Sequence, residues 1–198
     1  VNPAEGKITK IKRNLTGRIP ADSEILVDYD FIVNFQGTRR DEYPSFSEPL
    51  VYDLYKQRVI EPYKILHPDY IFIGMDEIRG MNRDSRSIKR GLENYELLAE
   101  FLNNITRILK NYFPNSTILY WDDMTSPFHN GKIEYQIDYA GSKGKTEYSA
   151  DLLDRNLTPI IWWYDSNDYW HTMADGAQFW KKLGFDFIGG PWDTSQNI

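Results

Sequence analysis

The chain has 198 residues, of which 41% are hydrophobic and 15% are aromatic, and it carries a formal net charge of -6 at pH 7. This hydrophobic content is enough for one globular core, which argues against a disordered chain. We expect no nucleic-acid partner, because no segment combines a basic stripe with exposed aromatic residues. We also expect no membrane partner, because no apolar stretch approaches the roughly 20 residues that a spanning helix needs.

The sequence contains no cysteine, which excludes disulfides, thiolate metal sites and a cysteine nucleophile. It opens on Val1-Asn2-Pro3, with neither an initiator methionine nor the basic and then apolar pattern of a signal peptide. We therefore expect a segment of a longer protein. These features leave the cellular location open, with a preference for a secreted or periplasmic protein.

Residues 1–44 are expected to form a β-hairpin followed by a polar loop. The two strands are predicted over 7–13 and 24–33, and the connection between them contains glycine and proline. We interpret this hairpin as an excursion from the domain that follows, which we place at 45–198.

A helix is predicted to begin at Glu48-Pro49, where Ser45 or Ser47 can cap it and proline is tolerated in the first turn. Its apolar stripe would consist of Leu50, Val51, Leu54, Tyr55 and Val59. A longer helix is predicted after Gly91, because apolar residues recur there at helical spacing. Its inner face would consist of Leu98, Phe101, Leu102, Ile105, Ile108, Leu109 and Tyr112.

Four short apolar runs bounded by turn residues predict β-strands. These runs cover 70–74, 117–121, 159–164 and 185–190. The segments between them are predicted as a loop over 78–86 before the long helix, a weak helix over 149–155 and a helix over 173–183. Strands that alternate with helices in this way indicate a parallel sheet.

The predicted fold class is therefore α/β, and the expected architecture is a partial (β/α)8 TIM-type barrel with parallel strands. A complete barrel of this kind needs about 250 residues, and only four of its strands are evident here. The missing strands would come from the remainder of the parent chain or from a homo-oligomer. The alternative is an open doubly wound sheet, but no glycine-rich phosphate loop follows any of the strands.

Acidic residues follow every one of the four predicted strands. They are Asp76-Glu77, Asp122-Asp123, Asp165 and Asp193. Active sites collect at the carboxyl ends of parallel strands, so we expect these side chains to line one cleft. Several tryptophans lie beside them, which suits a saccharide, because sugar C–H faces stack on aromatic rings while sugar hydroxyls bind polar groups.

Three of these strand ends resemble the catalytic barrel of glycoside hydrolase family 20, the β-N-acetylhexosaminidases. Residues 71–77 are similar to the family's strand that ends in Gly-Gly-Asp-Glu, and 119–123 are similar to its next strand, which carries tryptophan and acidic residues. Gly190-Pro191-Trp192 is similar to a later Pro-Trp turn of the family. The resemblance extends over roughly 49–193.

The resemblance implies a glycosidase of carbohydrate metabolism that needs no cofactor. Glu77 would be the general acid that protonates the leaving oxygen, and Asp76 would orient the 2-acetamido group of the substrate, which itself attacks the anomeric carbon. Trp121 would form one wall of the sugar pocket. Further walls would come from Trp163, Tyr164 and Trp192.

The chain departs from the family pattern at three positions. Phe72 stands where the family usually has histidine, and Met75 stands where it has glycine. Asp193 replaces a tyrosine whose hydroxyl holds the acetamido oxygen. A related sugar without the acetamido group is therefore also a possible substrate.

Further residues near the strand ends are candidates for substrate binding. They are Asp122, Asp123, Asp193, Arg79 and His129. For Arg79 the alternative is a salt bridge that neutralises the neighbouring carboxylates, and for His129 it is an ordinary place in a loop.

Two other functions fit the same residues. The first is a carbohydrate-binding barrel that lacks catalysis or has a different specificity. The second is a metal-dependent barrel enzyme in which Asp76, Glu77, Asp122 and Asp123 bind a hard cation. We expect no zinc site, because none of the three histidines has a neighbouring histidine at ligand spacing.

Overall fold

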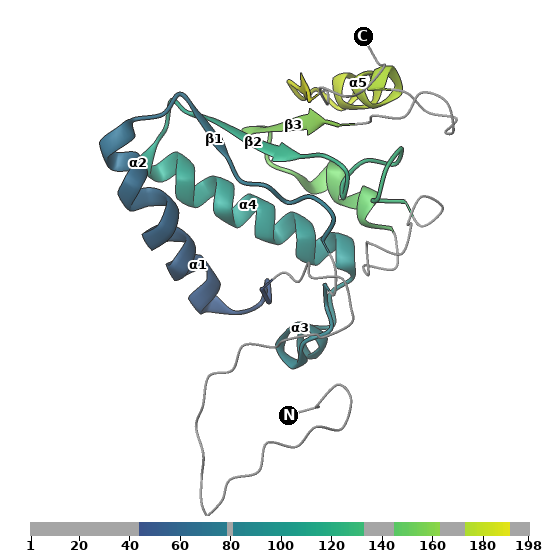
Figure 1. The fold of residues 1–198 in the computed structure, drawn as a ribbon. Helices are drawn as coiled ribbons and strands as arrows, with labels where there is room; N and C mark the ends of the chain where they lie inside the picture. Colours follow the sequence, from purple (N-terminus) through teal and green to yellow (C-terminus); the bar gives the residue numbers. More distant parts are fainter. Residues whose placement is uncertain (1–43, 79–80, 133–144, 163–172, 191–198) are drawn as a thin grey trace, which may run out of the picture. The chain divides into compact units, whose positions relative to one another are not determined.

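The computed structural model describes four stretches of the chain, residues 44–78, 81–132, 145–162 and 173–190 (Figure 1). All four belong to one compact unit of the chain, 40–198. The hairpin that the sequence predicts over 7–33 lies outside the described residues.

Helices and strands alternate along this unit. Its helical elements are α1 (Pro49–Tyr55), the π-helical turn η1 (Lys56–Ile60), α2 (Glu61–Leu66), α3 (Ser85–Arg90), α4 (Asn94–Tyr112), the 3-10 helix η3 (Thr146–Leu152) and α5 (Met173–Lys182). Its strands are β1 (Tyr70–Phe72), β2 (Thr117–Trp121), β3 (Leu157–Ile161) and β4 (Ile188–Gly189).

The four strands form one sheet with the order β1-β2-β3-β4, and each neighbouring pair is parallel. In register, Ile71 pairs with Ile118, Leu119 with Thr158 and Ile160 with Ile188. The ladder extends past the end of β1, because the Trp121 N–H donates to the Gly74 carbonyl at 2.9 Å. The predicted α/β class with parallel strands is thus confirmed.

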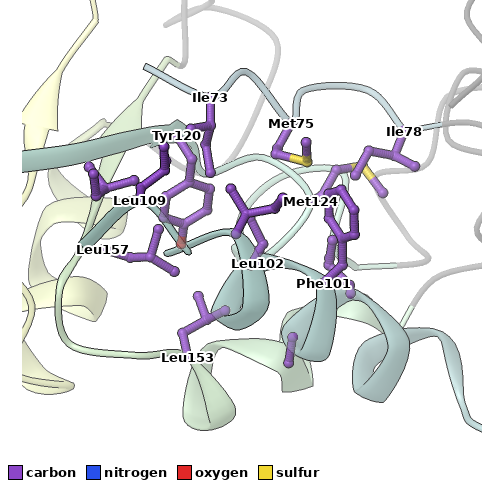
Figure 2. Packing of buried hydrophobic residues seen from close by; sticks show 14 of the residues in the cluster. Ile73, Met75, Ile78, Phe101, Leu102, Leu109, Tyr120, Met124, Leu153 and Leu157 are labelled. Atoms are coloured by element: carbon purple, nitrogen blue, oxygen red, sulfur yellow. The ribbon is translucent and has the colours of Figure 1, made fainter. Parts of the chain in front are cut away.

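Helix α4 packs its apolar stripe against one face of this sheet. A capping box fixes its first turn, in which the Glu93 N–H donates to the Glu96 carboxylate at 2.8 Å. Figure 2 shows Leu102 and Leu109 of α4 directed towards Tyr120 of β2. The buried residues of α4 are Leu97, Leu98, Ala99, Phe101, Leu102, Ile105, Thr106 and Leu109.

The predicted inner face of this helix is confirmed at Leu98, Phe101, Leu102, Ile105 and Leu109, which are all buried. It is wrong at Tyr112, which is 49% exposed. The helix ends at Tyr112, and the next residue, Phe113, turns into the core instead. No helix in the described stretches is both long enough and apolar enough to cross a membrane.

Helix α5 closes the same face of the sheet near β3. Gly176 lets it approach closely, because a Cβ atom there would lie 3.2 Å from the Ile161 side chain. Trp180 of α5 is fully buried and packs edge-on against Tyr120 of β2, with ring centroids 6.5 Å apart. The two helices therefore cover one face with a single continuous core.

The opposite face of the sheet is apolar and partly exposed. Alternation along the strands brings Tyr70 and Phe72 of β1, Leu119 and Trp121 of β2 and Ile188 of β4 to this face. Tyr70 is 63% exposed and Phe72 is 45% exposed.

The first helix departs from the prediction in its cap and its stripe. Glu48 caps α1, because its carboxylate accepts from the Leu50 N–H at 3.2 Å, whereas Ser45 and Ser47 were expected to do so. Leu50 and Leu54 belong to the predicted stripe but are 57% and 46% exposed.

The helix that begins as α1 continues through η1 into α2. Pro62 in the first turn of α2 has no N–H to donate, and the wider π-helical turn before it accommodates the missing hydrogen bond. Val51, Tyr55 and Val59 of the predicted stripe pack against the core, and Ile60 at the end of η1 is buried.

Helix α3 begins where the sequence predicts a loop over 78–86. Asp84 caps it by accepting from the Arg86 and Ser87 N–H groups at 3.1 and 3.0 Å. Gly91 ends it in the left-handed conformation, with φ of 65°.

Three other boundaries also differ. The weak helix expected over 149–155 is η3, which begins at Thr146, and β3 begins at Leu157, two residues before the prediction. The strand expected over 185–190 is reduced to β4, because Phe185 turns into the core and packs on Trp180 with ring centroids 5.2 Å apart.

Candidate functional site

A turn with unusual backbone geometry follows β1 and carries the predicted acidic pair. Gly74, Met75 and Glu77 have φ of 73°, 81° and 43°. A left-handed conformation costs roughly 1–2 kcal/mol for each residue that is not glycine. Met75 and Ile78 are both buried in the core (Figure 2), which offsets that cost and leaves Asp76 and Glu77 half-buried at the strand end.

The two carboxyl groups after β2 have different partners, because the chain leaves the strand after Trp121 and enters a turn in which the Thr125 N–H donates to the Asp122 carbonyl at 2.8 Å. Asp122 accepts from the Trp180 indole N–H at 2.9 Å, which places it on the side covered by α5. Asp123 Oδ2 accepts from the Glu77 backbone N–H and from the Asn130 side-chain amide, both at 2.9 Å. Asp123, and not Asp122, therefore meets the turn that carries Glu77.

Burial raises the pKa of both of these carboxyl groups. The pKa of Asp122 is raised to about 7 by desolvation, which outweighs the hydrogen bond from Trp180. The pKa of Asp123 is raised to about 8 by desolvation, against the hydrogen bonds from Asn130 and the Glu77 N–H. Each group therefore holds a proton at pH values at which an exposed aspartate is ionised.

We expect the free energy of unfolding to fall as the pH rises from 5 to 8. The folded protein binds protons at Asp122 and Asp123 that the unfolded chain has already released above pH 4, so this stabilisation is complete below pH 4 and is lost as the pH passes about 7 and 8. Asp122→Asn should reduce the fall in the free energy of unfolding between pH 5 and pH 8 by about 1 kcal/mol or more, as measured by urea titrations at each pH. Asp151→Asn, at an exposed position, is the control and should leave the slope unchanged.

Aromatic rings form a row across the ends of β1, β2 and β3. Trp121 packs edge-on against Phe72 and against Trp162, with ring centroids 5.3 and 6.1 Å apart. Trp162 in turn lies 4.5 Å from the ring of His129, measured between centroids. The row places three strand ends and the loop after β2 beside one another.

His129 is buried at the end of this row. Its Nδ1 accepts from the Asn130 backbone N–H at 2.9 Å, and burial lowers its pKa to about 3. The imidazole is therefore neutral at physiological pH, and it cannot supply a proton from an imidazolium ion.

Trp162 is a member of this row that the sequence prediction missed, since it named Trp163 instead. The predicted strand extends to Tyr164, whereas β3 ends at Ile161, so that Trp162 is the first residue after the strand. Ile160 pairs with Trp121, and continued alternation from Ile160 puts Trp162 on the same face as Trp121.

The structure thus brings together Asp76, Glu77, Trp121, Asp123 and His129 at one edge of the sheet. Asp122 instead accepts from the Trp180 indole N–H on the face covered by α5, although its charge still acts on Asp123. The remaining predicted site residues, Arg79, Trp163, Tyr164, Trp192 and Asp193, lie outside the described residues.

The alternative of a metal site requires four carboxylates that converge. Asp122 instead accepts from the Trp180 indole N–H, and Asp123 accepts from the Glu77 N–H. In the part of the chain that the structure describes, no three or more His, Cys, Asp or Glu side chains are arranged to hold a metal ion. The donor set therefore does not fit a hard cation.

A small hollow elsewhere in the unit involves none of the predicted site residues. It is lined by Pro44, Ser45, Phe46, Met81, Asn82, Asp84 and Leu97. These residues precede α1, surround the start of α3 or belong to α4, so the hollow is not formed by the strand ends.

No protein-family model matches this chain, and no curated protein matches it significantly. Its function is therefore inferred from its residues and their geometry alone.

Proposed function

We propose that this chain is part of the catalytic barrel of a glycoside hydrolase that releases terminal N-acetylhexosamine or a related sugar. One observation carries the proposal: the backbone N–H of Glu77 is held by Asp123, two residues after Trp121, at 2.9 Å. The acidic pair and the aromatic row therefore share the carboxyl edge of neighbouring parallel strands, which is where barrel enzymes carry out their chemistry.

The strand order supports a barrel over a doubly wound sheet. Every strand lies beside its successor in sequence, without the reversal of order that defines the switch point of a doubly wound sheet. The helices α4 and α5 pack on the same face, and the other face is apolar, as the interior of a barrel would be. The remaining strands would come from the rest of a parent chain or from a second copy.

In the proposed reaction Glu77 donates a proton to the glycosidic oxygen as the bond to the anomeric carbon breaks. The acetamido oxygen of the substrate attacks that carbon, and Asp76 stabilises the positive charge that develops on the resulting ring. His129 is neutral, so it does not compete with Glu77 as the acid. The rings of Trp121 and Trp162 supply apolar faces for the sugar.

A second candidate function is carbohydrate binding without hydrolysis. The aromatic row favours it, because stacking of a sugar on Trp121 and Trp162 requires no carboxylic acid.

The proposal is tested with the full-length parent protein and with this chain alone. Both are assayed against 4-nitrophenyl N-acetylglucosaminide, N-acetylgalactosaminide and glucoside. We expect hydrolysis of at least one acetylated substrate, at a higher kcat/KM than that of the glucoside. Hydrolysis of the glucoside alone would overturn the 2-acetamido mechanism, binding without hydrolysis would favour the second candidate, and neither binding nor hydrolysis would reject both.

A further inference from the structure

The turn that carries Glu77 is held in place from a different strand. Glu77 adopts a left-handed backbone conformation, with φ of 43°, which a glutamate rarely adopts unless its surroundings impose it. Its N–H donates to Asp123 Oδ2 over a separation of 46 residues. The backbone of Glu77 is thus held by a contact outside its own segment.

Asp123 is itself fixed more firmly than a substrate ligand would be. It is fully buried, and the same oxygen that binds the Glu77 N–H also accepts from the Asn130 amide at 2.9 Å. Its backbone carbonyl accepts from the Gly131 N–H at 2.7 Å. Gly131 in turn fits tightly, because a Cβ atom there would lie 2.7 Å from the Ser126 carbonyl.

A buried carboxyl group with two donors on one oxygen is suited to holding a backbone and is poorly placed to meet a sugar in solution. We propose that Asp123 is a positioning residue, which fixes the Glu77 N–H and thereby aims the Glu77 carboxyl group at the glycosidic oxygen. Asn130 supports it from the loop after β2. This inference rests on the proposed function, because it assigns a role within the same site.

If Asp123 has this role, the wild type and Asp123→Asn should have similar activity, and Asp123→Ala should be much less active. Asp123→Asn keeps an oxygen that can accept from the Glu77 N–H, whereas Asp123→Ala leaves that N–H without its acceptor. Misplacement of a catalytic group by about 1 Å can cost about 100-fold in rate, so we expect kcat to fall by about 100-fold in Asp123→Ala. KM should change little, and Asp123→Asn should stay within about 5-fold of the wild type.

The leaving group separates positioning from a general structural role. A 2,4-dinitrophenyl glycoside departs without protonation, whereas the phenyl glycoside needs the acid. We expect the loss of about 100-fold in Asp123→Ala for the phenyl substrate and a loss of less than about 3-fold for the dinitrophenyl substrate. Equal losses for the two substrates would overturn the proposal.

Amide hydrogen exchange tests the same contact without any substrate. The Glu77 N–H should be protected in the wild type and in Asp123→Asn, and it should exchange at least about 10-fold faster in Asp123→Ala. Unchanged protection would overturn the positioning role, even if the protein hydrolyses glycosides. If the wild type hydrolyses none, the proposed function fails and the exchange rates still decide the contact.

Asn130→Ala provides a second variant in case Asp123→Ala does not fold. It removes one of the two donors to Asp123 Oδ2 and leaves the carboxyl group in place. We expect a loss of about 10-fold for the phenyl substrate, a smaller loss for the dinitrophenyl substrate and faster exchange of the Glu77 N–H. The proposal would be contradicted if Asn130→Ala hydrolysed the phenyl and dinitrophenyl substrates in the same ratio as the wild type and its Glu77 N–H exchanged at the wild-type rate.

Discussion

Glu77→Gln is expected to lower kcat for hydrolysis of an N-acetylglucosaminide by about 100-fold to 10,000-fold, the range that a general acid contributes. Glutamine has nearly the same shape as glutamic acid, and the backbone N–H that binds Asp123 is unaffected by the change. Sugar binding should therefore remain close to that of the wild type. Steady-state kinetics measure the first effect, and calorimetric titration with a non-hydrolysed thioglycoside measures the second.

The control for this substitution is Glu61→Gln. Glu61 is an exposed residue of α2 that pairs with Lys64 at 2.8 Å, and it is not part of the strand-end site. An exposed pair of this kind contributes little, because water and salt screen it, so both activity and stability should be nearly unchanged. Full activity of Glu77→Gln would refute the assignment of Glu77 as the acid, and retained binding in a protein without any turnover would favour the carbohydrate-binding alternative.

Trp180→Ala is expected to cause the largest loss of stability, about 3–5 kcal/mol. The indole is fully buried among Tyr120, Phe179 and Phe185, with ring centroids between 4.9 and 6.5 Å away, and its N–H donates to Asp122. A whole domain is stable by only about 5–15 kcal/mol, so this change removes a large share. Urea unfolding at pH 6 followed by circular dichroism measures it.

Trp180→Phe separates the hydrogen bond from the packing. It keeps an aromatic ring in the core but removes the donor to Asp122, whose buried carboxyl group then loses this partner. We expect a loss of about 1–3 kcal/mol, clearly smaller than that of Trp180→Ala. Equal losses in the two variants would show that the ring contributes little, contrary to its burial.

Most of the sheet could be predicted from the sequence, because buried parallel strands are short apolar runs with clear ends. The predicted bounds of β2 are confirmed at both residues, Thr117 and Trp121, since Ser116 and Asp122 interrupt the run. The stripe of α4 could also be predicted, because its 19 residues span more than five turns and the helical period is unambiguous.

The misses have local physical causes. The predicted stripe of α1 is confirmed at Val51, Tyr55 and Val59, which pack against the core. It is wrong at Leu50 and Leu54, which are exposed while Tyr52 packs on Phe101 instead. Helix α3 was missed because its six residues include no apolar stripe, and its only sequence signals were the residues at its two ends, Asp84 and Gly91. The predicted length of β4 was wrong because the apolar residue Phe185, which was counted as part of the strand, packs in the core against Trp180 instead.

For the site, the sequence predicted which strand ends would meet but not what each carboxyl group does there. Asp122 and Asp123 are identical in type, so only their contacts distinguish the one that meets Trp180 from the one that meets the Glu77 N–H. The left-handed backbone at Glu77 carries no signal in the sequence, because glutamate is not a residue that favours it.

The adjacency of Asp122 and Asp123 makes the length of the chain after Trp121 as important as its composition. Insertion of a single residue between Trp121 and Asp122 would displace both carboxyl groups from their partners, the Trp180 indole N–H and the Glu77 N–H. Both attachments would then fail at once. Redesign of this edge must therefore preserve residue spacing, even where it changes the side chains.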